Sequence, residues 1–302
     1  MRRLAQAFGA AMTVTEMLDA EYYAGGNPEA ALRSQGSGID PHVVQIAGCR
    51  PDRMGEAAKL AEAAGAAMID INMGCPAKRV TGGAAGSALM RDLDLAVSLI
   101  RAVIAAVKIP VSLKMRLGWD AATINAPELA RRAEGEGIAM LTVHGRTRCQ
   151  FYDGKADWAA IREVRRASSL PLVANGDCAS LADARTMLAA SGADAVMVGR
   201  AAVGRPWFVG EVARDLAGRP KASPSAAERG SAALEHYRTL LSLFGMEQGL
   251  RHARKHLSAY ALKSESPDAA ALRDKLVRSE NPREVESLLL HLFEIERPAE
   301  AA

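Results

Sequence analysis

The segment Ala66-Ala67-Met68-Ile69-Asp70-Ile71-Asn72-Met73-Gly74-Cys75-Pro76-Ala77-Lys78 indicates a buried strand that stops at a thiol-bearing turn. Its first half is mostly apolar, and it is interrupted abruptly by Gly74-Cys75-Pro76. Because proline restricts the backbone, this turn is rigid. The exits of strands are the places where barrel enzymes carry their chemistry. Cys75 is therefore the first candidate for a functional residue.

Other apolar segments repeat this pattern along the chain and alternate with amphipathic helical segments. The predicted strands are 12–17, 43–47, 68–72, 111–116, 140–144, 172–175 and 195–198. The helical patterns among them are 2–8, 53–64, 94–106, 126–134, 157–167 and 180–190. Several strands are apolar almost throughout, as strands buried on both faces are. This alternation over about 215 residues predicts an α/β domain with the (β/α)8 TIM-barrel fold.

The count of strands is one short of the eight in such a barrel. The chain opens in the helical pattern 2–8, so the first strand of the barrel would precede Met1. Two interpretations stay open: either the barrel is built differently, or the sequence starts downstream of the true start. We favour the second.

The character of the chain changes towards its C-terminus. Residues 218–225 are rich in proline and serine, which is typical of a linker. The helical patterns 227–244, 250–262 and 281–293 follow with no strand between them, and Ser225 or Ser231 fits as the N-cap of the first. We predict a barrel domain over 1–216, a linker over 217–225 and a small helical domain over 226–302.

Composition narrows the class of protein. The 302 residues are 49% hydrophobic and 24% charged, and the net charge of +3 provides no global field for nucleic acid, so any basic patch is local. No apolar run approaches the roughly 18 residues of a membrane span, and a signal peptide is not evident. Neither a membrane association nor a stable protein partner is implied.

The four cysteines are Cys49, Cys75, Cys149 and Cys178. They are widely spaced and form no C-x-x-C pair, which favours reduced thiols in the cytoplasm over a disulfide framework. Zinc and iron–sulfur sites usually show closely spaced ligands, so we predict no metal site.

Polar residues gather where the predicted strands end. They are Gln45, Asn72, Cys75, Lys114, Arg116, His144, Arg146, Asn175, Asp177 and Arg200. Because the carboxyl ends of barrel strands meet at one face, we expect these side chains to line a ligand site. A single member can equally satisfy a neighbour or cap a loop, but the set as a whole favours a ligand.

Two loops within this set are candidates for an anion site. Asn175-Gly176-Asp177 and Gly199-Arg200 follow the strands expected as the seventh and eighth, which is the usual phosphate position in barrels. Lys114 lies inside a strand and needs an anionic neighbour: a phosphate, a substrate carboxylate or a reduced flavin would serve. His144 remains open as a donor, a base or a metal ligand.

These residues resemble a known family, the tRNA-dihydrouridine synthases, and most closely its bacterial B-type subgroup. The resemblance rests on the segments 70–78, 86–90, 114–116, 142–147, 174–177 and 198–201, and it extends over essentially the whole chain. Members of that family are FMN-dependent TIM barrels with a helical tRNA-binding domain. They normally begin with a strand and an FMN-holding loop, for which these 302 residues have no counterpart.

The resemblance implies a role for each matching residue. Cys75 would be the catalytic acid, and Asn72 would help to place the flipped uridine. The residues implied for FMN are Gln45, Lys114 and His144 near the isoalloxazine or ribityl part, and Asn175, Gly176, Asp177, Gly199 and Arg200 near its tail and phosphate. Lys78 and Arg146 would lie near the RNA, and NADPH would be the electron source.

The implied chemistry is consistent with the residues present. Reducing the C5=C6 bond of uracil requires a hydride on one carbon and a proton on the other, and a reduced flavin supplies the hydride. An ordinary thiol is mostly protonated at pH 7 and can donate the proton. The base must leave the RNA stack, so the helical domain is expected to help select the tRNA.

A basic stripe in that domain suits phosphate contacts. Arg251, Arg254 and Lys255 share one helix face by their spacing. Taken alone, the stripe is more typical of a solvated charged face. The family resemblance instead favours phosphate contacts with RNA. Two alternative functions remain: an FMN barrel that reduces a free pyrimidine or small enone, and a truncated relative that binds RNA without catalysis.

Overall fold

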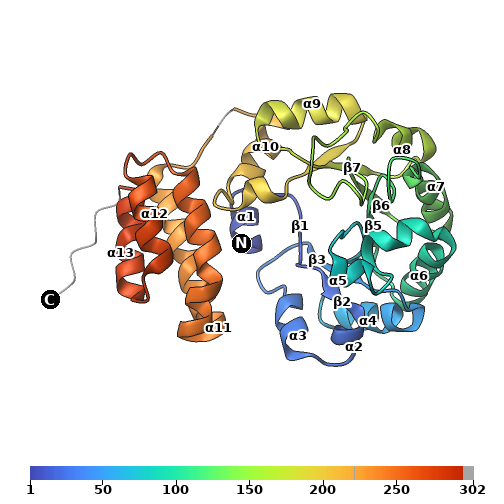
Figure 1. Cartoon of the computed structure of the whole chain (residues 1–302), viewed down its shortest axis with the longest axis horizontal. Helices are drawn as coiled ribbons and strands as arrows, with labels where there is room; N and C mark the ends of the chain where they lie inside the picture. Colours follow the sequence, from blue (N-terminus) through green and yellow to red (C-terminus); the bar gives the residue numbers. More distant parts are fainter. Residues whose placement is uncertain (221, 295–302) are drawn as a thin grey trace. The chain divides into compact units, whose positions relative to one another are not determined.

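A computed structural model describes residues 1–220 and 222–294 (Figure 1). The chain divides into two compact units. The sheet unit comprises Arg2 and Ala11–Gly199, and the helical unit comprises Met1, Arg3–Ala10 and the chain from Arg200 onward. The predicted domain boundaries at 216 and 226 remain a prediction.

The sheet unit is built on a single parallel sheet. Its strands are β1 (Thr13–Val14), β2 (Leu18–Asp19), β3 (His42–Ala47), β4 (Met68–Met73), β5 (Val111–Arg116), β6 (Met140–His144), β7 (Leu172–Asn175) and β8 (Ala195–Met197). Their order is β1-β3-β4-β5-β6-β7-β8, with β2 also paired to β3, and every pairing is parallel. The predicted α/β class and TIM-barrel-like order are confirmed.

One predicted strand is wrong in detail. Within the segment 12–17 only Thr13–Val14 forms a strand, β1, and a second two-residue strand, β2, follows at Leu18–Asp19; the two pair with opposite ends of β3. The apolar pattern could not show that the chain leaves the sheet between them. Every side chain of β3 is buried, as expected for a strand covered on both faces.

Helices follow the strands and cover the outer side of the sheet. They are α2 (Ala20–Ala24), α3 (Pro28–Ser34), α4 (Pro51–Ala63), α5 (Lys78–Thr81), the 3-10 helix η1 (Gly86–Arg91), α6 (Leu93–Ala106), α7 (Ala126–Glu136), α8 (Arg162–Ala167) and α9 (Leu181–Ser191). In Figure 1, α6 to α9 succeed one another along the sheet, and each contacts the next. The core therefore lies between this helical layer and the strands.

The helix predicted over 157–167 begins later than expected. α8 starts at Arg162 because the residues before it serve the loop that follows β6. The backbone N–H of Asp157 donates to the carbonyl of Gly145 at 2.6 Å. The indole Nε1 of Trp158 donates to the carbonyl of Gly176 at 2.8 Å. These bonds hold the segment against the carboxyl ends of β6 and β7.

The helical unit is formed by α1 (Arg2–Ala7, apart from Arg2), the 3-10 helix η2 (Arg200–Ala202), α10 (Phe208–Leu216), α11 (Ala226–Lys263), α12 (Ala269–Arg278) and α13 (Pro282–Leu292). Ser225 caps α11 in a reciprocal capping box with Glu228, which confirms one of the two predicted caps. At Gly245, with φ +72°, the helical backbone of α11 is interrupted between the two predicted helices. α12 was not predicted.

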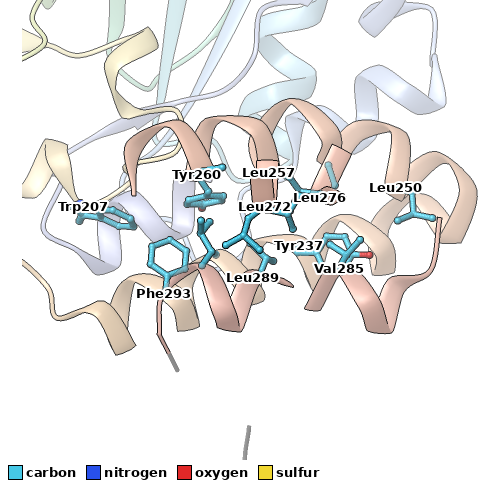
Figure 2. Close-up of a cluster of buried hydrophobic side chains, with 14 residues drawn as sticks. Trp207, Tyr237, Leu250, Leu257, Tyr260, Leu272, Leu276, Val285, Leu289 and Phe293 are labelled. Atoms are coloured by element: carbon cyan, nitrogen blue, oxygen red, sulfur yellow. The ribbon is translucent and has the colours of Figure 1, made fainter. Parts of the chain in front are cut away.

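A cluster of buried side chains holds α11, α12 and α13 together (Figure 2). Within it, Tyr260 is stacked on Trp207 with ring centroids 6.5 Å apart and lies edge-on to Phe293 at 6.4 Å. Leu276 and Leu289 are 1% and 0% exposed. The apolar faces of three helices thus make a core of their own. No helix among the described residues is long and apolar enough to cross a membrane.

Candidate active site

Cys75 lies on the turn between β4 and α5, at the carboxyl end of the sheet. The Oδ1 atom of Asn72 accepts hydrogen bonds from the backbone N–H groups of Gly74, at 3.0 Å, and of Cys75, at 2.9 Å. Short polar side chains stabilise turns in this way because they replace missing backbone partners. Asn72, predicted near the uridine, therefore also fixes the backbone that carries the thiol.

The 3-10 helix η1 closes the other side of this turn. The carbonyl of Cys75 accepts hydrogen bonds from the Ser87 backbone N–H at 3.1 Å and from its hydroxyl at 2.9 Å. Gly86 has φ +59°, and a Cβ there would lie 2.8 Å from the Cys75 carbonyl oxygen. A side chain at Gly86 would thus push against the cysteine backbone.

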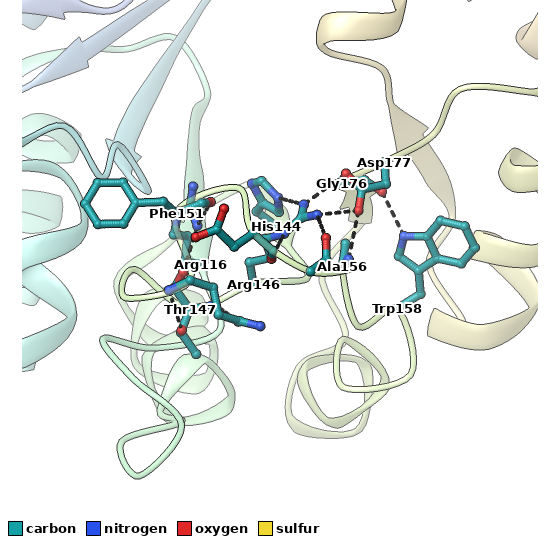
Figure 3. A network of polar contacts seen from close by, with 12 residues as sticks. Arg116, His144, Arg146, Thr147, Phe151, Ala156, Trp158, Gly176 and Asp177 are labelled. Carbon is teal, nitrogen blue, oxygen red and sulfur yellow. Dashed lines mark hydrogen bonds and ion pairs between the residues drawn. The ribbon is translucent and has the colours of Figure 1, made fainter.

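Arg116 ties the Cys75 turn to the loop after β6. Arg116 is 1% exposed, and its guanidinium donates to three backbone carbonyls. Nε donates to Gly74 at 2.8 Å, and Nη1 donates to Thr147 at 2.7 Å and to Phe151 at 2.8 Å. Carbonyls from two loops converge on one cation, so the turn and the loop are held in a fixed relation (Figure 3).

Lys114 lies beside Asn72 in the register of the β4–β5 pair, so both side chains leave the same face of the sheet. Its Nζ donates to Asn175 Oδ1 at 3.3 Å, and Asn175 in turn donates to the carbonyl of Met197 at 2.9 Å. Desolvation lowers the pKa of Lys114 to about 8, opposed by the charge of Asp70. The structure therefore brings Lys114 and Asn175 together, as predicted for one ligand site.

Arg146 is the centre of a second network (Figure 3). It is 1% exposed, and its Nη1 and Nη2 donate to the two carboxylate oxygens of Asp177 at 3.0 and 2.5 Å. Nε donates to the carbonyl of Asp153, Nη2 donates to that of Gly154, and Nη1 also donates to His144 Nε2. All five N–H donors are used, so the predicted RNA contact of Arg146 finds no support in this arrangement.

The bond from Arg146 determines which tautomer His144 adopts. A guanidinium only donates, so His144 Nε2 accepts at 3.2 Å and the ring proton resides on Nδ1. Burial and the nearby cations Lys114 and Arg116 lower the pKa of His144 to about 3. The imidazole is neutral at physiological pH and offers one N–H, which makes it a donor to a ligand.

The predicted anion loops lie in different settings. Gly176 has φ +119°, and a Cβ there would meet His144 Cδ2 at 2.9 Å, so the loop after β7 requires glycine. A Cβ added to Gly199 meets no atom within 4 Å among the described residues. Arg200 is exposed and belongs to the helical unit.

The cations predicted near RNA are exposed, apart from Arg146. Lys78 lies at the start of α5, three residues after Cys75. Arg251, Arg254 and Lys255 are exposed on α11, where Arg254 lies 3.9 Å from a carboxylate oxygen of Glu280.

Gln45, predicted near the FMN ring, is buried and lies on β3, beside β4.

Asp70 and Ser112 were missed as site residues, although Asp70 lies in the buried segment that leads to Cys75. Asp70 is 2% exposed and accepts hydrogen bonds from Gln45 Nε2 and Ser112 Oγ, both at 2.6 Å. The signal was the spacing of two residues between Asp70 and Asn72, and again between Ser112 and Lys114. This spacing puts each pair on one face of its strand.

The ordered parallel sheet and the polar side chains at its carboxyl edge define a TIM-barrel-like α/β protein with an enzyme-type site. Its fold is similar to that of histamine dehydrogenase from Rhizobium sp. 4-9, with a TM-score of 0.54 and 14% identity, covering 72% of this chain and 42% of that one. At that identity the likeness concerns the fold alone.

Residues 1–296 match the family described as dihydrouridine synthase (Dus), and the chain belongs to this family. A probable tRNA-dihydrouridine synthase of Rhizobium leguminosarum bv. phaseoli is 50% identical over 293 residues, which cover 97% of this chain and 90% of the relative. A tRNA-dihydrouridine synthase B of Xanthomonas axonopodis pv. citri is 46% identical over 283 residues, with 93% and 85% covered. The predicted family is confirmed, and the relatives include the B-type.

Proposed function

We propose that this protein reduces the C5=C6 bond of specific uridines in tRNA to dihydrouridine, with Cys75 as the proton donor. The observation that carries the proposal is the position of the thiol. Cys75 follows Asn72, which lies beside Lys114 across the β4–β5 pair, and Asn72 holds the Cys75 backbone through two hydrogen bonds. The family membership of the chain supports the same reaction.

The residues at the carboxyl edge fit an FMN cofactor. Lys114 Nζ has one long hydrogen bond at 3.3 Å, and the facing Thr142 Oγ1 is buried with no partner among the described residues. Buried polar groups require partners, so both atoms suit a polar ring edge. Gln45, Lys114 and His144 would hold the ring, while Asn175, Gly176, Asp177, Gly199 and Arg200 would lie towards its phosphate. When bound and reduced, FMN supplies the hydride.

The other steps belong to this chain. Cys75 Sγ gives its proton to the second carbon of the uracil bond and is later reprotonated from solvent, while Asn72 orients the base. Exposed Lys78, Arg251, Arg254 and Lys255 bind tRNA phosphates. NADPH is the proposed electron donor, and the cytoplasm is the proposed location.

The proposal is tested with the purified protein, FMN, and tRNA that lacks dihydrouridine. NADPH is expected to bleach the flavin absorbance anaerobically, and the tRNA is expected to restore it as dihydrouridine forms. NADH in place of NADPH tests the donor. Reduction of free uracil but not tRNA would favour the alternative of a small-molecule reductase, and RNA binding without flavin absorbance would favour the non-catalytic alternative.

A further inference from the structure

A continuous chain of side-chain hydrogen bonds runs across three strands to the Cys75 turn. It begins at Asp70 on β4, which accepts from Gln45 Nε2 on β3 at 2.6 Å. Gln45 Oε1 then accepts from Asn72 Nδ2 at 2.8 Å. Asn72 Oδ1 completes the chain by accepting from the backbone N–H of Cys75 at 2.9 Å. Ser112 on β5 holds the far end through its hydroxyl, 2.6 Å from the second Asp70 oxygen.

The two ends of this chain require the same orientation of both amides. Backbone N–H groups only donate, so the oxygen of Asn72 must face the turn and its NH2 group must face Gln45. The oxygen of Gln45 therefore faces Asn72, which leaves its NH2 group for Asp70. From the other end, a carboxylate only accepts, which again selects the NH2 group of Gln45.

Burial makes the orientation costly to reverse. Asp70 is 2% exposed, and Gln45 and Asn72 are 8% and 7% exposed, so water offers little compensation for a lost bond. If the amides of Gln45 and Asn72 were both turned over, the NH2 group of Asn72 would point at the N–H groups of Gly74 and Cys75. Donors would then face donors at the turn that carries the thiol.

The observed orientation also leaves donors for a ligand. An amide NH2 group has two hydrogens, and within the described residues Gln45 and Asn72 each use one of them. The second N–H of Asn72 suits a carbonyl oxygen of the uracil ring, and that of Gln45 suits an acceptor on the flavin. A reversed chain would offer carbonyl oxygens in their place.

We propose that Asp70 is a positioning residue that, together with Ser112, sets the amide orientation of Gln45 and Asn72. Asn72 thereby holds the Cys75 turn with its oxygen and offers its remaining N–H to the uracil. The statement about uracil rests on the proposed function, whereas the statement about the turn does not.

The test compares Asp70→Asn with the double variant Asp70→Asn/Ser112→Ala. In Asp70→Asn, the new amide can still accept from Gln45, provided that its NH2 group donates to the Ser112 hydroxyl. Without that hydroxyl the new amide can turn over and reverse the whole chain. Both variants lack the charge of Asp70, so they differ only in whether the Ser112 hydroxyl is present to orient residue 70. Ser112→Ala alone keeps the carboxylate and serves as the control.

Two readouts are measured. The first is kcat for dihydrouridine formation at saturating FMN, with KM for tRNA measured in parallel. The second is the alkylation rate of each cysteine by iodoacetamide, resolved by mass spectrometry, with buried Cys178 as the internal reference. Alkylation does not depend on uridine reduction.

We expect Asp70→Asn and Ser112→Ala each to lower kcat by less than the double variant does. The double variant is expected to lose at least tenfold in kcat with KM little changed, and to alkylate Cys75 at least fivefold faster with Cys178 unchanged. Equal kcat values and equal Cys75 alkylation rates for Asp70→Asn and the double variant would overturn the positioning role. A parallel rise in the alkylation rate of Cys178 would overturn it too. A wild type that forms no dihydrouridine would overturn the proposed function, and the alkylation rates would still decide the role of Asp70.

Discussion

Replacing Asp177 by asparagine removes the only carboxylate bound to Arg146 within the described residues, and that carboxylate also accepts a hydrogen bond from the backbone N–H of Ala156 at 2.8 Å. The Arg146 side chain is 2% exposed and forms a bidentate ion pair with Asp177, whose side chain is 28% exposed. Asp177 has φ +58°, a conformation that asparagine adopts readily. The substitution therefore keeps the backbone conformation of residue 177, while it removes the charge and replaces one acceptor oxygen by an NH2 group.

The cost follows from the burial of Arg146. Removing one partner of a fully buried ion pair costs about 3–5 kcal/mol because the other charge is left uncompensated. Here the carbonyls of Asp153 and Gly154 remain as acceptors, and the partial exposure of Asp177 admits water. We expect a loss of about 2–3 kcal/mol in the free energy of unfolding, which lowers the melting temperature of a 150–250-residue domain by about 4–12 °C.

The assay is thermal unfolding followed by circular dichroism at pH 7. The matched control is Asp94→Asn, which breaks an ion pair with Arg132 in which the aspartate side chain is 91% exposed. Exposed pairs contribute less than about 1 kcal/mol, so the control is expected to melt within a few degrees of the wild type. If Asp177→Asn melts no lower than Asp94→Asn, the reasoning about the buried pair is wrong.

Three further results are expected. Gly86→Ala should lose at least tenfold in activity and about 1–2 kcal/mol in stability, measured by turnover and urea unfolding, because φ is +59° and the new Cβ presses on Cys75. The affinity for FMN, measured by fluorescence quenching, should fall as pH rises through about 8, where Lys114 loses its charge because its pKa is lowered from 10.5; Lys114→Met should abolish this dependence. Replacing the exposed α11 cations Arg251, Arg254 and Lys255 by alanine should weaken tRNA binding about tenfold and reduce its salt slope by about 2, measured by filter binding.

Each of these predictions has a control. Gly83→Ala should leave activity unchanged, since the nearest atom to its new Cβ is 3.6 Å away. Lys275→Ala removes an exposed cation of α12 and should leave the salt slope of tRNA binding unchanged. An α11 triple variant that binds tRNA as the wild type does would remove that helix from the RNA surface. An FMN affinity independent of pH in the wild type would contradict the role given to the Lys114 charge.

The strands and the position of Cys75 could be predicted because both depend on local patterns. A buried parallel strand needs an apolar run, and such runs located β3 to β8 to within a residue or two at each end. The strand predicted over 12–17 was too long, since only Thr13–Val14 of it pairs with β3, because apolar composition does not show where the chain leaves a sheet. The late start of α8 had the same origin, since Asp157 and Trp158 are held by loops elsewhere in the chain.

The networks of the site depend on contacts that the sequence does not display. Asp177 lies 31 residues beyond Arg146, and the other partners of Arg146 include backbone carbonyls that any residue type provides. Asp70 carried a visible signal, a charged residue two positions before Asn72 in a buried strand. What could not be read was its partner Gln45, 25 residues earlier, because only the register of β3 against β4 brings the two together.

The central claim is that Cys75 donates the proton when this protein reduces uridine in tRNA. The most direct measurement is a single turnover, without oxygen, of flavin-reduced enzyme mixed with tRNA that lacks dihydrouridine, comparing the wild type with Cys75→Ala. We expect both proteins to bind the tRNA equally and the variant to form dihydrouridine at least a hundredfold more slowly. Equal rates of dihydrouridine formation in the two proteins would contradict it.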